Sequence, residues 1–559
     1  MDVIAKQVDV IPMVKHYINE MGLHEIFDRY IPNTHGADIK PAQVLCTMIT
    51  NIMVATKPLY KIEQWLSDYT DGKTEDLLIA KKYNDDRCGR VVDRLYEADR
   101  HSILTEATAS AIRVHTLETQ SIHNDSTSIT FSGAYENQSP HAVQLEQGHN
   151  KDYRPDLKQI VFGLNITEDG HVPIGYQVYN GSTADITTHQ TNWDSLRSFI
   201  SEDEFIYIAD CKLSSQKNLH HIDSHGGYFI TLVPKNIKEI KQFIQRVKEG
   251  EEIHWGNGYS VENSRKKGEY TMYHTYDNEQ SADGYRIIWV HCSSKESRDK
   301  KTRQRQITKA EQELQSLSER LNKYYLKTHE QIKKSVNNIC SSIGNQLIVE
   351  IKEKVSVEKK QKGRGRAGTE TNYEEITTIT YELHWHRNKE VIKQESRADG
   401  LFPLITNKKQ MDASDVLKHY KQQPFLEKRF HTKKSTFDVA PVFLHKNERI
   451  EGILFLYFIA LMLVSLIERN IRQQMSQQEI EGIAIRPNGT QCKSPTWDNI
   501  RYFFRNIYLA FIVDGKITIN TQLKGLSPMH AQLLMLLKVP LSIYENLQDY
   551  WWEFEFASG

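Results

Sequence analysis

The chain has 559 residues, with 71 basic and 72 acidic side chains. At roughly 100 to 200 residues for each domain, this length predicts about three to five structural units. A net charge near zero disfavours a simple nucleic-acid coat protein, which needs an overall positive charge. The six cysteines lie far apart without CxxC spacing, which indicates neither a zinc knuckle nor a disulfide framework and favours a reducing cytoplasm.

The sequence predicts neither a signal peptide nor a membrane-spanning helix. The N-terminus lacks a basic region followed by an apolar stretch and a small-residue cleavage site, which argues against secretion. The longest apolar run, Ile453 to Ile467, has 15 residues and falls short of the roughly 20 that cross a bilayer. We therefore expect a buried core helix there.

Residues 1–115 are predicted to form an independent helical domain. Apolar residues recur at helical spacing in DVIPMVKHYINEMGLHEIF, and the segment from Val44 to Ala55 is almost wholly apolar between polar flanks.

From Ile122 to Val233 the pattern changes to short β-rich runs separated by turn signals. The runs are SIHNDSTSITF, QIVFGLNI, VPIGYQVY, FIYIAD and YFITLV. Helices are predicted at about 187–200 and 213–224, on either side of the fourth run. The resulting order of strand, strand, strand, helix, strand, helix, strand is that of a ribonuclease-H-like mixed α/β core, although periodicity alone allows other α/β folds. This first part of the core is assigned to residues 116–234.

Residues 235–396 are charged and polar and are predicted to be an insertion. Apolar residues follow heptad spacing at positions 307, 310, 314, 317, 321 and 324, which predicts a short coiled coil or a helical hairpin. Two β-rich runs, QLIVEIKEKVSV and ITTITYELHWH, flank the basic segment KKQKGRGRAG, which is predicted to be a flexible loop. Between Lys295 and Arg366 there are 19 Lys or Arg and 9 Asp or Glu, which suits either a phosphate backbone or a solvated helical arm.

Residues 397–475 are predicted to be the second part of the core, with a helical block at about 412–474. Residues 476–559 form a C-terminal tail, whose role the sequence leaves open between dimerisation and DNA contact.

Two aspartates lie where strands rarely carry acids. Asp125 is inside IHNDSTSI, and Asp210 ends FIYIAD. The first and fourth strands of the predicted core lie side by side, so two carboxylates 85 positions apart are expected to converge. Convergent carboxylates repel each other unless a cation lies between them, and oxygen-rich sites suit Mg²⁺ or Mn²⁺. The ordinary explanation of a single Asp at a strand end is a turn or a helix cap.

A third acid belongs to a spaced pattern in DVLKHYKQQPFLEKRFHTKKSTF. Tyr420, Glu427 and Lys434 resemble the YREK signature (Tyr-x2-Arg-x3-Glu-x6-Lys) of a group of DDE insertion-sequence transposases. Gln423 stands where the signature has Arg, and a neutral amide cannot clamp a phosphate bidentately. In one continuous helix these four positions fall within about 60° of arc, whereas Pro424 favours a helix that begins there and leaves Tyr420 outside.

The resemblance extends to GHNKDYRPDLKQIVFGLNITEDGHVPIGYQVYNGSTADITT and VAPVFLHKNERIEGILFLYFIALMLVSLIER. It implies a transposase that cuts and joins DNA. Asp125, Asp210 and Glu427 would be the catalytic ligands of two Mg²⁺ ions, with Mn²⁺ as a substitute. Tyr420, Gln423 and Lys434 would contact DNA.

The implied partners are double-stranded DNA, as terminal inverted repeats and as target, and a second copy of the chain. The N-terminal domain would bind DNA, the chain would work on the nucleoid of a prokaryotic cytoplasm, and no membrane is involved. No nucleotide cofactor is expected, because the GKT at Gly72 lacks the upstream glycine of a phosphate-binding loop.

Two alternatives remain open at this level. One is a ribonuclease-H-like nuclease that cuts DNA without joining it. The other is a catalytically silent DNA-binding descendant, motivated by Gln423, although the three retained acids argue against it.

Several further residues admit a functional and an ordinary explanation. The resemblance implies a tryptophan that stacks on a flipped base, for which Trp255, Trp289 and Trp385 are candidates, but sheet packing is favoured for each. A structural role is favoured for His123 and His189. The basic residues beside Glu427 would contact phosphates, although a charged helix face explains most of them, and only Lys434 is favoured individually. These are Lys428, Arg429, His431, Lys433 and Lys434.

Overall fold

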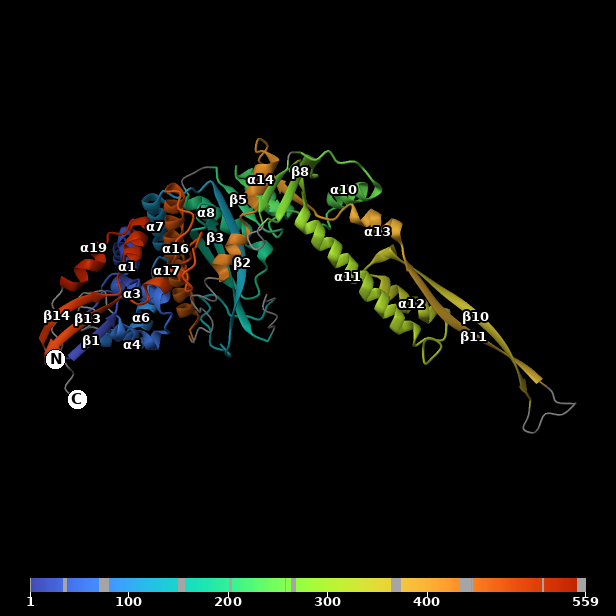
Figure 1. The fold of residues 1–559 in the computed structure, drawn as a ribbon, viewed down its shortest axis with the longest axis horizontal. Helices are drawn as coiled ribbons and strands as arrows, with labels where there is room; N and C mark the ends of the chain where they lie inside the picture. Colours follow the sequence, from blue (N-terminus) through green and yellow to red (C-terminus); the bar gives the residue numbers. More distant parts are fainter. Residues whose placement is uncertain are drawn as a thin grey trace. The chain divides into compact units, whose positions relative to one another are not determined.

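The fold divides into two compact units, which are described separately (Figure 1). The first comprises Met1–Thr231 with Lys418–Gly559, and the second comprises Leu232–Leu417. The five-segment division expected from the sequence stays a prediction. The computed structural model describes residues 2–33, 38–69, 80–148, 156–200, 204–256, 258–262, 268–362, 373–431, 444, 446–514 and 517–549.

The predicted N-terminal helical region is confirmed, and a strand precedes it. The apolar segment at Val44 lies in α3, where nearly every side chain is buried. Strand β1 (Asp2–Gln7) pairs antiparallel with β13 (Tyr508–Asp514), a partner about 500 positions away that no local pattern reveals. The helices are α1 (Ile11–Glu20), α2 (Leu23–Tyr30), α3 (Pro41–Val54), α4 (Ile62–Asp68), α6 (Asp85–Glu97) and α7 (Arg100–His115), with short turns η1 (Leu59–Lys61) and η2 (Ala80–Tyr83).

The predicted strand and helix order of the core is also confirmed. Its strands lie in the spatial order β4-β3-β2-β5-β6. The first three pair antiparallel, whereas β2–β5 and β5–β6 are parallel, as expected when helices connect them. The elements are β2 (Ser121–Phe131), β3 (Lys158–Thr167), β4 (Pro173–Asn180), η3 (Asp185–Thr187), α8 (His189–Phe199), β5 (Ile206–Ala209), α9 (Gln216–Ser224) and β6 (Tyr228–Leu232).

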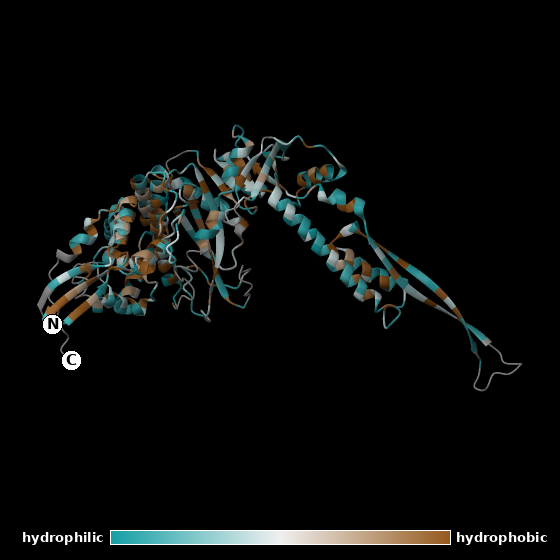
Figure 2. Cartoon of the chain, viewed as in Figure 1, coloured by the Kyte–Doolittle hydropathy of each residue, from teal (hydrophilic) through white to brown (hydrophobic). Residues whose placement is uncertain are grey.

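The apolar run from Ile453 to Ile467 lies in α16 (Asn447–Gln477), the long helix at the centre of the first unit. The helix is long and apolar enough to cross a membrane by composition, but 89% of its most apolar window is buried inside the protein. It packs against α3, α6 and β4, and hydrophobic segments surround it in Figure 2. The prediction of a buried core helix is therefore confirmed.

The C-terminal region completes the first unit. β13 pairs on one side with β1 and on the other with β14, which makes a three-stranded antiparallel sheet. This sheet joins the two ends of the described chain. The elements are α17 (Trp497–Phe504), β13, β14 (Ile517–Lys524), α18 (Pro528–Leu536), α19 (Ser542–Glu545) and η6 (Asn546–Asp549).

The second unit contains an antiparallel sheet, a helical hairpin and a two-stranded ribbon. The sheet has the order β12-β9-β8-β7, and the ribbon pairs β10 with β11, which confirms the two predicted β-rich runs. The basic loop predicted from Lys359 begins later than expected, because β10 continues to Gln361, and residues 363–368 of that loop lie outside the described residues. The elements are α10 (Lys238–Glu249), β7 (Tyr259–Glu262), β8 (Tyr270–Gln280), β9 (Arg286–Cys292), α11 (Ser293–Ser318), α12 (His329–Cys340), η4 (Gly344–Gln346), β10 (Leu347–Gln361), β11 (Tyr373–Arg387), α13 (Lys389–Ser396) and β12 (Leu401–Thr406).

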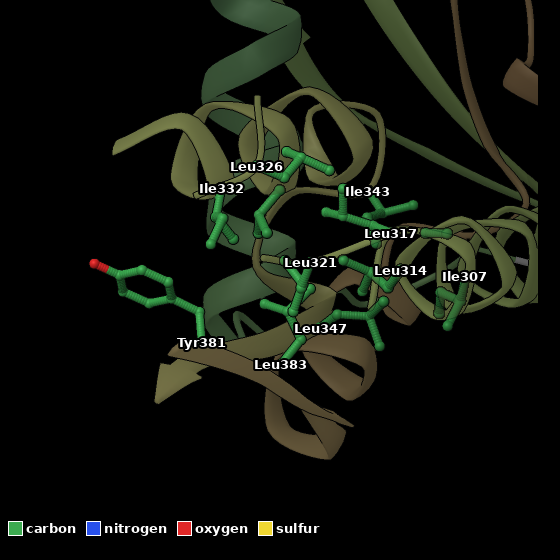
Figure 3. Close-up of a cluster of buried hydrophobic side chains, with 12 residues drawn as sticks. Ile307, Leu314, Leu317, Leu321, Leu326, Ile332, Ile343, Leu347, Tyr381 and Leu383 are labelled. Atoms are coloured by element: carbon green, nitrogen blue, oxygen red, sulfur yellow. The ribbon is translucent and has the colours of Figure 1, made fainter. Parts of the chain in front are cut away.

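The heptad residues pack into the core of this unit, with one exception. Leu314 and its neighbours on α11 meet α12 and the base of the ribbon in a buried cluster (Figure 3). The helical hairpin is therefore the correct alternative. Tyr324 is 85% exposed, so the heptad assignment is wrong there: α11 ends at Ser318, and Tyr324 lies in the reversal with a φ of 52°. Leu326 and Ile332 complete the cluster instead.

Truncating this cluster tests its role. Leu314 is fully buried, so Leu314→Ala should lower the free energy of unfolding by about 2–5 kcal/mol through lost burial and a residual cavity. Tyr324→Ala, a matched loss at an exposed heptad position, should change it by less than about 0.5 kcal/mol. Urea unfolding of the full chain measures both, and equal effects would contradict the assignment.

Candidate active site

The parallel pairing of β2 with β5 brings the two predicted aspartates together. Ser121 is paired with Ile206, and the pairing continues to His123 with Ile208. Two residues further along the same register, Asp125 stands beside Asp210, the residue directly after β5. Neighbouring strands lie about 4.8 Å apart, and residues at the same register of parallel strands project from the same face. The two carboxylates therefore share one face and one end of the sheet.

Backbone groups orient both carboxylates. Asp125 Oδ1 accepts a hydrogen bond from the N–H of Ser126 at 2.8 Å, and Asp210 Oδ1 accepts one from the N–H of Lys212 at 2.9 Å. The hydroxyl of Thr231 on β6 donates to the carbonyl oxygen of Asp210 at 2.6 Å. The end of β5 is thus fixed on both sides, and each carboxylate has a defined direction.

Tyr420 completes this group of residues. It is the last residue of α14 (Ala413–Tyr420). Burial raises the pKa of Tyr420 above its ordinary value, and the negative charges of Asp210 and Asp125 raise it further. Its phenol therefore stays protonated and can donate a hydrogen bond.

Gln423 connects the following turn to β2. Its Oε1 is 2.8 Å from Nδ1 of His123, and its Nε2 donates to the carbonyl oxygen of Asn124 at 2.8 Å. The side chain that replaces the signature arginine thus binds the strand residues immediately before Asp125. Its role as a DNA contact stays a prediction, and the geometry gives it a different one: it attaches the α14–α15 segment to the aspartate strand.

Glu427 lies on α15 (Pro424–His431), which begins at Pro424. The chain does not form one continuous helix through Tyr420 and Glu427, so the single helical face expected from the signature spacing is wrong, because proline at the first turn starts a new helix. Glu427 is exposed, and it lies in the first turn of α15. Lys434, like Lys433, lies outside the described residues.

Among the described residues, no group of three or more His, Cys, Asp or Glu side chains is arranged to hold a metal ion. The structure thus pairs Asp125 with Asp210 and does not place Glu427 with them as a third ligand. Its part in the site stays a prediction. Two carboxylates side by side nevertheless form an oxygen-donor set that a divalent cation would stabilise.

A buried polar network supports β2 from its other face. Asn124 donates to Oδ1 of Asn165 on β3 at 2.9 Å, and Asn165 in turn contacts Asn192 of α8 at 2.8 Å. Asn192 also donates to the hydroxyl of Tyr207 at 2.9 Å, which is 3.2 Å from Nδ1 of His189. The sequence interpretation missed these asparagines; among them only Asn165 has a local signal, as a polar residue in the apolar run IVFGLNI.

Three histidines near the site make packing and hydrogen-bond contacts, and for His123 the sequence favours such a structural role. His123 is fully buried, and its pKa is lowered to about 4 by burial. His419 lies 2.5 Å from Glu168 and 3.2 Å from the hydroxyl of Ser121. His171 stacks on Phe425 of α15 with ring centroids 4.1 Å apart. These contacts hold the segment after Leu417, including α15, on the face of β2 that carries Asp125.

The candidate tryptophans all belong to the second unit. Trp289 is buried and stacks on Phe243 at 4.2 Å between ring centroids, and Trp385 is packed against the α11–α12 cluster. For both, the expected sheet packing is confirmed. Trp255 lies edge-on to Tyr276.

The buried His123 predicts a pH dependence of stability. An unfolded histidine has a pKa near 6.5, whereas that of folded His123 is about 4. Between these values the unfolded chain holds the proton and the folded chain does not, so stability rises with pH and is lost as the pH falls from 6.5 toward 4. His123→Gln should flatten this slope by on the order of 1–3 kcal/mol across the window. Thermal unfolding at several pH values measures it, with the exposed His141→Gln as control, and an unchanged slope in His123→Gln would refute the argument.

Comparison with known proteins identifies the family of the chain. Among solved structures, the piggyBac transposase in a synaptic complex with hairpin DNA is similar at 12% identity and a TM-score of 0.25; the match covers 50% of this chain and 59% of that one. No curated protein sequence matches. Residues 3–109 match a domain of unknown function (DUF4277). Residues 120–463, more than half of the chain, match the transposase DDE domain, and the chain therefore belongs to the DDE transposase family.

Proposed function

We propose that this protein is an active DNA transposase that binds the ends of its own insertion sequence, cleaves a strand there and joins it to target DNA. DDE transposases catalyse polynucleotidyl transfer, generally with divalent metal ions. The observation that carries the proposal is the β2–β5 register, which sets Asp125 beside Asp210 at one end of the core sheet.

The donor set fits a hard divalent cation. Asp125 and Asp210 would hold it, and Glu427 would come from α15 as the third carboxylate. Two Mg²⁺ ions, for which Mn²⁺ could substitute, would when bound supply Lewis-acid stabilisation of the attacking and leaving oxygens of an in-line phosphoryl displacement.

The side chains around the aspartates hold the site in place. Gln423 fixes the start of α15 to β2, and Glu427 lies in the first turn of that helix. Tyr420 stays protonated beside the carboxylates and would donate a hydrogen bond to a DNA oxygen. Lys434 would contact a phosphate. No side chain needs to form a covalent intermediate, because the attacking group is first water and then the freed 3′-hydroxyl.

The partners follow from this chemistry. Both terminal inverted repeats and the target must be double-stranded DNA, and pairing two ends requires two active sites, which favours a homodimer in the DNA complex. Energy from a nucleotide is not required, since each joining step exchanges one phosphodiester bond for another. The setting would be the nucleoid of a prokaryotic cytoplasm.

Neutralising either aspartate tests the site. Asp125→Asn and Asp210→Asn should each lower strand cleavage and strand joining by at least roughly 100-fold, while DNA binding and the melting temperature change little. Asp514→Asn is the matched control, because Asp514 also ends a strand of the first unit and is exposed. The assays are Mg²⁺-dependent nicking of DNA that carries the element ends and joining of pre-cleaved ends.

The same assays separate the other functions. If the unaltered protein cleaves DNA without joining it, the protein is a nuclease. If it binds DNA without either reaction, it is a catalytically silent binding protein. Full activity of Asp125→Asn or Asp210→Asn would contradict the proposed site.

The third ligand is tested separately. Glu427→Gln should reduce cleavage and joining as strongly as Asp210→Asn, because the metal site would lose a charged ligand. Raising the Mg²⁺ or Mn²⁺ concentration should partly restore Glu427→Gln if the acid binds metal. Unaltered activity in Glu427→Gln would remove Glu427 from the site and leave the aspartate pair in place.

A further inference from the structure

Helix α11 of the second unit carries a row of basic side chains along one face (Figure 1). At 100° per residue, four cationic positions of this helix fall within about 80° of arc. They span about 16 Å along the helix axis, because each residue adds about 1.5 Å. All four side chains are exposed. We term this set the α11 basic stripe, and its members are Arg298, Lys301, Arg305 and Lys309.

The packing of the opposite face of α11 turns the stripe toward solvent. Ile307 and Leu314 are buried in the α11–α12 cluster, and both lie about 170° of arc from the centre of the stripe. Arg303, on the same buried side, donates two hydrogen bonds to Asp399 at 2.6 Å. The orientation of the helix about its axis is therefore fixed by contacts in which the stripe takes no part.

The four acids of α11 leave three cations of the stripe without an ion pair. Glu313 lies 3.7 Å from Lys309, but both side chains are substantially exposed, so this pair is weak. Within the described part of the chain, Arg298, Lys301 and Arg305 form no ion pair. The other three acids are directed to residues outside the stripe, namely Glu296 to His291, Asp299 to Lys295, and Glu311 to Arg387.

The cations of the stripe repel one another. Arg298 precedes Lys301 by three positions, and Arg305 lies four positions from both Lys301 and Lys309. Side chains at these spacings are neighbours on a helix surface, and like charges there destabilise the helix. A solvated helix face usually mixes charges that attract one another. The stripe thus lacks the internal compensation of an ordinary charged surface, and an external anion would remove the repulsion.

We infer that the α11 basic stripe binds the phosphate backbone of double-stranded DNA. The inference rests on the proposed function and adds a DNA contact outside the site that contains the two aspartates. Phosphates of one strand follow one another at about 3.4 Å along the duplex axis, so a stripe of about 16 Å can face several of them. Contacts from Lys and Arg to phosphates carry no sequence information. The stripe would therefore add affinity and orient the duplex without selecting its sequence.

Replacing three residues of the stripe together tests the inference. In the full chain, Arg298→Gln, Lys301→Gln and Arg305→Gln are combined, and binding to a fluorescent duplex that carries one element end is measured by anisotropy between roughly 50 and 200 mM salt. Loss of three phosphate contacts should make the slope of log K against log salt shallower by about 2.7, at about 0.9 for each contact. The melting temperature should not fall, because the changes are on the surface and remove a repulsion. Combining Arg298→Lys, Lys301→Arg and Arg305→Lys, which keeps every charge, should retain the slope.

Lys300 provides a matched control on the same helix. It is exposed and adjacent to Lys301, but it lies about 100° of arc or more from every member of the stripe. The single changes Lys301→Gln and Lys300→Gln therefore remove the same charge from neighbouring positions on different faces. Lys301→Gln should make the slope shallower by about 0.9, whereas Lys300→Gln should leave it unchanged. Equal changes in the two variants would indicate a general charge effect and overturn the inference.

The remaining outcomes separate this inference from the proposed function. If the triple Gln variant binds DNA with the slope of the unaltered protein, the stripe does not contact DNA and the inference alone fails. If the unaltered protein does not bind the duplex at all, the proposed function fails with it. Equal DNA slopes, together with binding of a polyglutamate peptide that the triple Gln variant loses, would identify a surface for an acidic protein segment and overturn the assignment to DNA.

Discussion

The parallel pairing of β2 with β5 is the constraint on which the candidate site depends. Each residue of β2 is paired with the residue 85 positions later on β5. Asp125 and Asp210 are separated by the same number of positions. Because side chains alternate between the faces of a sheet, a slip by one residue would turn one aspartate to the opposite face. Both faces of β2 are buried, so such a slip would also break the hydrogen bonds of Asn124 on one face and of His123 on the other. These buried polar contacts therefore fix the geometry of the carboxylates.

Two hydrogen-bond networks, one on each face of β2, hold the strand in that register. On one face, Asn124 and Tyr207 join the amide network that reaches α8. On the other face, Gln423 and His419 bind His123 and Ser121. A buried polar group without a partner is costly, so each network stabilises only one arrangement of strand and helix. Helix α15 carries Glu427, whereas Asp125 lies on β2 and Asp210 directly follows β5.

Buried ion pairs extend this support to the long core helix. Arg429 of α15 binds Glu468 of α16, and Arg469 binds Asp169 in the turn after β3; both arginine side chains are at least nine-tenths buried. Removing one partner of such a pair leaves an uncompensated buried charge, which costs about 3–5 kcal/mol. The positions of α15 and of the β3–β4 turn are therefore tied to α16.

The sequence by itself determined the elements whose signals are local. Alternating and apolar runs located β2, β5 and α16. An acid inside one predicted strand and another at the end of a second strand indicated Asp125 and Asp210. Pro424 indicated the start of α15. Only the tertiary structure decided which distant groups meet. The pairing of β1 with β13, the binding of Gln423 to His123 and the reversal that exposes Tyr324 depend on contacts between residues far apart in the chain or on the end of a helix. Spacing along a sequence records periodicity within an element, whereas these contacts depend on how elements pack, and packing has no local pattern.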